Sequence, residues 1–292
     1  MLSNSVKGIF YGCGAAICYG TNPLGALFLY CEGLSPESVL CYRFATAIVL
    51  LALLMLFNRN RFAIKKAEIL PLAVLGFLFA FCALTLFAAF NYMDAGLAST
   101  LLFLYPLEVA LMMALIYKER LTAKTGAAIA LSLLGIGLLY RGGEGGMPLS
   151  SIGLLLVFLS SFTYAIYIVF VNKANLQMGP LKLTFYVMIF CLLFLTLYSV
   201  CLGSGLPPLL QSPSSYGWAL MLGFVPTVLS LVLMTKAVKI VGSTSTAIMG
   251  GLEPLTAVVI GVCVFGETLT IRLALGILLV LASVVVLAVK KK

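Results

Sequence analysis

The sequence contains no histidine. That absence excludes Ser-His-Asp and Cys-His catalysis, histidine proton relays and most zinc-protease sites. The eight cysteines form no C-x-x-C pair, so they indicate neither a metal site nor a disulfide framework. The sequence also lacks a G-x-x-x-x-G-K-S/T loop, which disfavours direct ATP-driven pumping by this chain. We therefore expect no cofactor and no metal ion, and we do not expect an enzyme.

Charged residues are scarce as well. They make up 9% of the 292 residues, whereas hydrophobic residues make up 63%, and the mean hydropathy is +1.18. So little polar surface cannot cover a water-soluble globule of this length. Apolar runs of about 20 residues recur along the chain, each long enough to cross a bilayer core as a helix. None alternates strictly, as membrane β-barrel strands do. The predicted fold class is therefore an all-α integral membrane protein.

Ten apolar runs are expected to span the membrane as helices. Their predicted ranges are 7–30, 36–57, 69–92, 95–117, 122–140, 150–171, 180–202, 216–238, 243–266 and 270–289. The loops between them are short, which leaves no room for a soluble domain. Because another span follows the first run directly, we interpret that run as a retained helix and not as a signal peptide.

Ten spans place both chain ends on one side of the membrane, and the basic residues indicate which side. Of the 18 basic residues, 15 fall on the side of the termini, which leaves Arg43, Arg141 and Arg272 for the other side. The positive-inside rule then predicts cytoplasmic termini for this multi-pass protein, which we expect in the plasma (inner) membrane. Topology and contact with anionic membrane lipids explain the formal net charge of +9, so no nucleic-acid partner is expected.

The two halves of the chain repeat one another. A shift of 148 residues lays 104–122 on 252–270, with matching prolines and glutamates: Pro106 with Pro254 and Glu119 with Glu267. A shift of 145 residues matches Tyr19 with Tyr164. Each half holds five spans, an odd number, so the second half must lie inverted relative to the first. The predicted halves are 1–141 and 150–292, joined by the glycine-rich stretch RGGEGG at 141–146.

Four short motifs carry a family resemblance. The first half contains YP at 105–106 and KERLT at 118–122, and the second contains LEP at 252–254 and GETLT at 266–270. With ten helices in two five-helix halves, the chain resembles the drug/metabolite transporter superfamily, and within it the EamA-like exporters. The resemblance implies export of a small organic molecule, such as an amino acid, a nucleoside or a toxic compound. It also implies a central cavity lined by spans 1, 3, 4, 6, 8 and 9.

Glu253 is the single carboxylate between residues 247 and 266, and it lies near the midplane of its span. A charged side chain facing lipid at that depth costs about 2.5 to 3.5 kcal/mol, so Glu253 is expected to face protein or water. Gly250, Gly251 and Pro254 predict a break in the helix around it. We hypothesise that Glu253 couples proton movement to transport or contacts a cationic substrate group. The alternative is a protonated acid that bonds to a neighbouring helix.

The first half has its own version of this arrangement. Tyr105 occupies the position equivalent to Glu253, and Pro106 predicts the corresponding helix break. Glu108 follows three residues after Tyr105, on the same helix face, and is the second candidate for proton coupling. Two deep acids on repeat-related helices suggest a shared polar cavity. The alternative for Glu108 is a purely structural hydrogen bond to a neighbouring helix.

Further candidates for substrate binding lie in spans 1 and 6: Tyr19, Thr21, Asn22, Thr163 and Tyr164. Pro23 predicts a helix break beside the first three. Tyrosines in membrane proteins also form interfacial belts or pack between helices, so contact with substrate is one of two interpretations. Glu119 and Glu267, at span ends, are expected to be structural. Arg43 is expected at the outer rim, in a salt bridge or snorkelling toward water.

The leading prediction is a secondary transporter that exports a small, amino acid-like or related metabolite by alternating access. A solute channel or facilitator is the alternative. A membrane-embedded lipid enzyme is disfavoured, because its usual histidine-rich or paired-aspartate sites are missing. Proton antiport, solute exchange and facilitated diffusion are each compatible with one deep acid. Gly12, Ala16 and Gly20 allow close packing of the first span, either within a monomer or in a homodimer.

Overall fold

The computed structural model describes residues 4–117, 123–140, 150–174, 176–202 and 205–288. The regular elements in these ranges are thirteen α-helices and one π-helix. They are α1 (Asn4–Gly20), α2 (Asn22–Cys31), α3 (Pro36–Phe57), α4 (Lys66–Ala89), α5 (Ala95–Leu102), α6 (Tyr105–Tyr117), α7 (Ala123–Tyr140), α8 (Ser151–Lys173), α9 (Pro180–Cys201), α10 (Pro213–Gly223), η1 (Phe224–Leu229), α11 (Ser230–Met249), α12 (Leu252–Phe265) and α13 (Ile271–Ala288). The stretch at 141–146 and Glu119 lie outside the described residues.

Six helical stretches of the described chain are long and apolar enough to cross a membrane. They are Pro36–Phe57, Lys66–Ala89, Ala95–Ile116, Ser151–Val171, Pro180–Cys201 and Pro213–Val241. Three shorter apolar helical stretches accompany them: Gly126–Gly135, Leu252–Phe265 and Ala274–Ser283. Large apolar side chains such as Phe57, Leu115 and Ile271 are exposed, as contact with lipid requires. The prediction of an all-helical membrane protein is confirmed.

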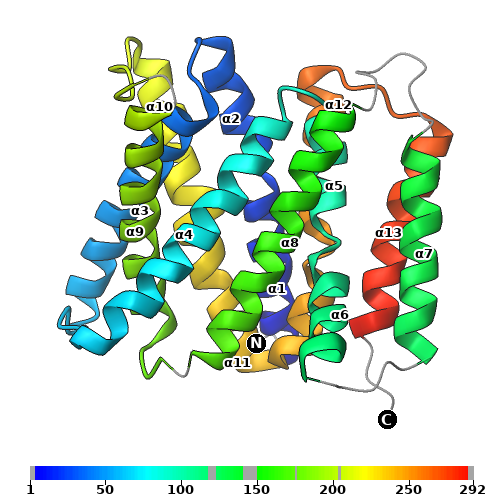
Figure 1. Ribbon diagram of the computed structural model, residues 1–292, viewed down its shortest axis with the longest axis horizontal. Helices are drawn as coiled ribbons and strands as arrows, with labels where there is room; N and C mark the ends of the chain where they lie inside the picture. Colours follow the sequence, from blue (N-terminus) through cyan, green and yellow to red (C-terminus); the bar gives the residue numbers. More distant parts are fainter. Residues whose placement is uncertain (1–3, 118–122, 141–149, 175, 203–204, 289–292) are drawn as a thin grey trace.

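The helices stand side by side in one bundle (Figure 1). The start of α1 and the end of α13 lie at the same end of it. On one flank α7 packs against α13, and on the other α3 packs against α9. Between them α4 packs against both α8 and α9, and α1 packs against α11. Helices from both halves of the sequence are therefore neighbours throughout the bundle.

Three predicted spans are interrupted. The chain breaks between α1 and α2, between α5 and α6, and between α11 and α12, where Gly250 and Gly251 form the turn. A proline stands in the first turn of each second helix: Pro23, Pro106 and Pro254. Proline has no N–H, so it cannot continue a preceding helix. It fits a first turn well, where the N–H groups have no partner within the helix.

The α11 segment first runs along α1 toward the start of α1 and then turns back alongside it. Near its start, Ser230 Oγ donates to the carbonyl of Ala15 in α1 (2.9 Å). Further along, the contacts with α1 are Val241 with Gly8 and then Met249 with Gly12. The chain therefore turns back near Val241, within Ser230–Met249 and between the two spans expected there.

The end of α1 packs directly on the start of α12. A Cβ atom added to Gly20 would lie 2.5 Å from the carbonyl oxygen of Glu253 and 2.6 Å from Cβ of Thr256. Real Cβ atoms do not approach other atoms so closely, so only glycine fits at this crossing. The small-residue positions of the first span thus bring two helix backbones together within one chain.

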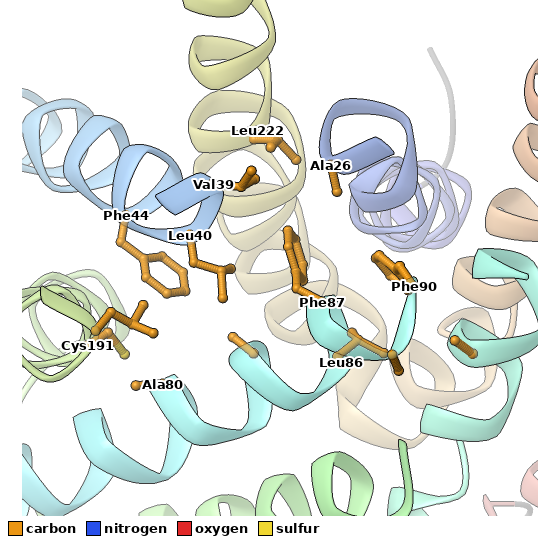
Figure 2. Close-up of a cluster of buried hydrophobic side chains, with 14 of the residues drawn as sticks. Ala26, Val39, Leu40, Phe44, Ala80, Leu86, Phe87, Phe90, Cys191 and Leu222 are labelled. Atoms are coloured by element: carbon orange, nitrogen blue, oxygen red, sulfur yellow. The ribbon is translucent and has the colours of Figure 1, made fainter. Parts of the chain in front are cut away.

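A packed apolar layer joins α2, α3, α4 and α10. Figure 2 shows Phe87 of α4 between Leu40 of α3, Leu222 of α10 and Ala26 of α2. All four side chains are fully buried. Phe44 of α3 lies in the same layer, toward Cys191 of α9 (Figure 2). This layer fixes the position of α3 around Phe44.

Glu267 joins the two halves of the chain at the opposite end of α12. Its Oε1 accepts a hydrogen bond from the backbone N–H of Ala95 (2.8 Å), and its Oε2 accepts one from Gly96 (3.3 Å). These are the first two residues of α5, whose N–H groups have no partner within the helix. A carboxylate there is also favoured by the helix dipole. The expected structural role of Glu267 is therefore a cap on α5.

Candidate functional site

Three tyrosines from two helices lie ring against ring inside the bundle. Tyr105 packs edge-on against Tyr164 of α8, with ring centroids 4.8 Å apart and an interplanar angle of 79°. Tyr164 stacks on Tyr167, one helical turn along α8, at 5.8 Å and 7°. Phe79 of α4 contacts the two α8 tyrosines at 6.2 and 5.4 Å. Rings at such distances and angles attract one another and form a firm aromatic wall.

Tyr19 and Glu253 complete this group, which we call the tyrosine–acid cluster: Tyr19, Tyr105, Tyr164, Tyr167 and Glu253. Glu253 is in electrostatic contact with Tyr19, Tyr105 and Tyr164. No group in the described part of the chain donates a hydrogen bond to its carboxylate. All five side chains are enclosed by surrounding helices yet keep some exposed surface. This partly exposed cluster is the candidate site.

The interrupted helices place the cluster. Tyr105 is the first residue of α6 and Glu253 the second of α12, while Tyr19 precedes the last residue of α1. The helix dipole gives a helix start a partial positive charge, so an acid in the first turn of α12 is favourably placed. The N–H groups of Glu253, Leu107 and Glu108 already bond to backbone carbonyls, and Pro254 and Pro106 have none, so this charge acts through the dipole.

Arg43 is buried, and our expectation that it lies at the outer rim is wrong. It is the eighth residue of α3, about 10 Å along the helix, and its side chain is 3% exposed. The guanidinium carbon lies 5.4 Å from the ring centre of Phe44 and 5.5 Å from that of Phe87. Arg43 is also in electrostatic contact with Tyr19. None of the described carboxylates forms an ion pair with it. Snorkelling fails here because the side chain points into the bundle.

The π-helical turn η1 supplies the hydrogen-bond partner of Arg43. Within it Pro226 has no N–H to donate to the carbonyl of Leu222, four residues earlier. The hydroxyl of Thr227 donates to that carbonyl instead (2.9 Å), and Thr227 Oγ1 accepts a hydrogen bond from Nε of Arg43 (3.0 Å). Single π-turns inside helices are frequent at functional sites. Sequence reasoning missed this turn, and Pro226 inside an apolar run is the signal that could have indicated it.

Three predicted substrate-binding residues bond to the backbone of their own segment. Thr21 Oγ1 donates to the carbonyl of Cys18 (2.7 Å), Asn22 Nδ2 to that of Tyr19 (2.8 Å) and Thr163 Oγ1 to that of Leu159 (2.6 Å). The first two satisfy carbonyls that the end of α1 leaves free. Asn22 Oδ1 is buried and has no partner among the described residues.

Glu108 lies one helical turn away from the cluster. Tyr105 and Glu108 both contact α8, at Tyr164 and Ser161, as their spacing of three residues requires. Ser161 Oγ donates to Glu108 Oε1 (2.8 Å), whereas Glu108 Oε2 is buried without a partner in the described chain. Ser161 also lines an apolar cavity of about 360 Å³ between α5 and α8. The structure thus brings Glu253 together with the tyrosines and sets Glu108 apart.

The arrangement is suited to holding a small organic molecule. Aromatic faces can cover its apolar body, and one unpaired acid can meet a positive or hydrogen-bond-donating group. Across the described residues no group of three or more histidine, cysteine or acidic side chains could hold a metal ion.

Comparison with known proteins places the chain in a family. The model of the EamA-like transporter family matches residues 6–141 and again 151–289. A protein of Archaeoglobus fulgidus described as an uncharacterized transporter is 30% identical over 75% of each chain. The uncharacterized transporter YcbK of Bacillus subtilis is 26% identical over 89% of this chain and 86% of its own length. A crystal structure with 17% identity superposes with a TM-score of 0.67, over 97% of this chain and 96% of that one, and shows the same fold. The relatives are named as transporters, and this protein is not an enzyme. The chain belongs to the EamA-like transporter family.

Proposed function

We propose that the protein is a secondary transporter that exports a small, amino acid-like or related organic metabolite by alternating access. It crosses the plasma membrane ten times, with both termini in the cytoplasm. Residues 1–141 and 150–292 form two inverted five-helix halves. The two separate matches to the family model support this division. The start of α1 and the end of α13 at one end of the bundle support an even number of crossings (Figure 1).

One observation carries the proposal: two repeat-related pairs of residues meet in one cluster. Tyr19 and Tyr164 are equivalent in the sequence repeat, and so are Tyr105 and Glu253. The four side chains are electrostatic neighbours in the structure. An axis that relates two inverted halves passes between them, so residues near it approach their own equivalents. A site on that axis is reached from either side of the membrane when the halves rock.

The residues of the cluster have distinct roles in this scheme. The rings of Tyr105 and Tyr164 cover the apolar part of the metabolite. Glu253 contacts a positively charged group or exchanges a proton with one side of the membrane. Thr21 and Asn22 hold the interruption after α1 in shape, Thr163 bonds within α8, and the buried Oδ1 of Asn22 offers one further acceptor. Proton coupling requires that Glu253 gain and lose its proton as the halves rock.

Counterflow in proteoliposomes tests this function. The purified chain is reconstituted, loaded with one unlabelled metabolite at a time, and assayed for uptake of the labelled compound, with and without an imposed pH gradient. We expect saturable uptake of at least one small metabolite. If uptake responds to the gradient, Glu253→Gln should abolish that response while solute exchange persists.

Glu68→Gln is the matched control, because Glu68 accepts from the backbone N–H of Lys65 at the start of α4 and glutamine can cap in the same way. It should behave as the native protein. Uptake that never saturates and shows no counterflow would identify a channel and reject a transporter. Unchanged gradient dependence in Glu253→Gln would reject proton coupling through this acid.

A further inference from the structure

We propose that Arg43 binds an anionic group of the transported solute, which makes the substrate a small organic anion or a zwitterion. The inference rests on the proposed function, because it assigns the chemistry of the solute to the same site. It starts from a buried cation that the described part of the chain leaves without a carboxylate.

A positive charge inside a membrane protein is costly unless an opposite charge accompanies it. Arg43 is 3% exposed, and its polar contacts are the neutral hydroxyls of Thr227 and Tyr19. Phe44 and Phe87 lie close to the guanidinium and keep water from it. Cation–π contacts return only part of the lost hydration. An arginine that serves packing alone would be replaced by an apolar residue at lower cost, so its charge indicates a partner that comes and goes.

The guanidinium is held ready for such a partner. Thr227 fixes Nε, and Thr227 is itself fixed by its bond to the carbonyl of Leu222 in the π-turn. Two nitrogens of the planar fork then remain on the side of Tyr19. Carboxylates and phosphates bind this fork with two parallel hydrogen bonds. We expect a bound anion to take the place beside Arg43 that Tyr19 holds in this structure.

The helix starts in the cluster carry partial positive charge, the same sign as Arg43. The N-terminal ends of α6 and α12 lie at Tyr105 and Glu253, and α2 begins three residues after Tyr19. The dipole of each helix gives its start a partial positive charge, which favours a negative group nearby. Interrupted membrane helices use such ends to bind anionic parts of a substrate. Glu253 offsets the positive charge of the helix starts on one side of Tyr19. Besides the anionic group at Arg43, the solute can therefore carry a positive group, whereas a second negative group is disfavoured.

A basic cavity of about 730 Å³ lies along the same helix face as Thr227. Leu231 and Thr235, four and eight residues after Thr227, line it, and so do Arg61, Lys182, Lys236 and Lys239. The described lining includes no acid. Basic residues at one membrane surface are common, so this cavity alone assigns nothing. On this helix face its lining begins at Leu231, about one helical turn after Thr227, the residue that holds Arg43.

Anion binding is tested on the full chain in nanodiscs, with the melting temperature as the readout. Two pairs of probes differ in charge at nearly constant shape: benzoate against benzamide, and phenyl phosphate against phenol. We expect one of the anions to raise the melting temperature by a few degrees more than its neutral counterpart. The pair that responds distinguishes a carboxylate from a phosphate as the preferred group.

Three variants locate the effect. Arg43→Lys keeps the charge but lacks the fork, and we expect its half-saturating anion concentration to rise about tenfold. Arg43→Gln should lose the anion-specific shift altogether. Arg59→Gln, an exposed arginine in the turn after α3, is the matched control and should respond as the native chain does. If Arg43→Gln fails to fold, the comparison between native and Arg43→Lys protein remains decisive.

The possible outcomes separate the two proposals. An anion-specific shift that depends on Arg43 supports the inference even if counterflow fails, in which case the transport function is rejected. Counterflow that accepts only neutral or cationic compounds, with equal half-saturation in native and Arg43→Lys protein, overturns the inference and leaves the transport function standing. The inference is also overturned if neither anion exceeds its neutral counterpart in the native protein.

Discussion

Two of the three interrupted spans, at α5–α6 and α11–α12, repeat one another in sequence but surround their acids differently. In both, a proline and a glutamate stand in the first turn of the second helix. Glu108 accepts a hydrogen bond from Ser161 of α8. Glu253 has no such donor in the described chain and lies beside Tyr19, Tyr105 and Tyr164. A repeated motif therefore fixes where a helix begins, while the neighbouring helix decides whether the acid is tied down or left available.

The largest effect is expected where α1 crosses the start of α12. Gly20→Ala places a Cβ 2.5 Å from the backbone oxygen of Glu253, and backbone cannot move aside as a flexible side chain can. Overpacking of this kind costs about 1 to 3 kcal/mol. We expect the upper end of that range, together with displacement of the cluster. The measurement is the free energy of unfolding in nanodiscs, combined with the counterflow assay.

Gly14→Ala is the control on the same helix. A Cβ at Gly14 meets only Cδ1 of Leu233, at 3.4 Å, the end of a flexible side chain. This variant should lose little stability, and the better helix propensity of alanine offsets part of the loss. Equal effects at Gly14 and Gly20 would show that close approach to α12 is not what holds the interruption in place.

The positions of the helix breaks could be predicted because they depend on local chemistry. Pro23, Pro106 and Pro254 cannot continue a preceding helix wherever the rest of the chain lies, and each stands in the first turn of a new one. The depth of Glu253 followed in the same way from its distance to charged residues at both ends of its span. These features need no knowledge of which helix packs against which.

The surroundings of Arg43 could not be predicted, because they depend on distant contacts. A water-soluble helix reveals its buried face because its apolar residues recur every three or four positions. In α3 apolar residues occupy nearly every side, so its sequence does not indicate which side faces the bundle. The partner Thr227 lies on a π-turn from the other half of the chain. Likewise the pairing of Glu108 with Ser161 requires the packing of α6 on α8.

The next largest effect is expected at the N-terminus of α5, the first half of the other interruption. Glu267→Ala removes the acceptor of the N–H groups of Ala95 and Gly96. Loss of a helix cap with its charge costs about 1 to 2 kcal/mol. Glu267→Gln keeps one acceptor oxygen and should lose less. Chemical unfolding of the three proteins checks the order, and an alanine variant as stable as the native chain would contradict the cap.

A smaller effect is expected for the bond that ties Glu108 to α8. A double-mutant cycle with Ser161→Ala, Glu108→Ala and the combined variant measures the coupling of the two side chains. Hydrogen bonds between membrane helices average about 0.6 kcal/mol, and we expect a coupling energy of that size. The counterflow rate of Ser161→Ala should remain close to native. A large loss of transport without loss of stability would instead place Glu108 in the transport mechanism.

The smallest effect on stability is expected for Glu253→Gln. No described group donates to this carboxylate, so the amide breaks no hydrogen bond, and it removes an acid that is costly to bury in charged form. We expect a change within about 0.5 kcal/mol of zero. Glu108→Gln, measured beside it, should lose more, because a neutral amide accepts the bond from Ser161 less strongly than a carboxylate does. If Glu253→Gln instead lowers stability by more than Glu108→Gln does, then Glu253 is the structural acid, and the assignment of the two repeats is reversed. If Glu253 is kept for function and not for folding, then Glu253→Gln must remain stable while its transport changes.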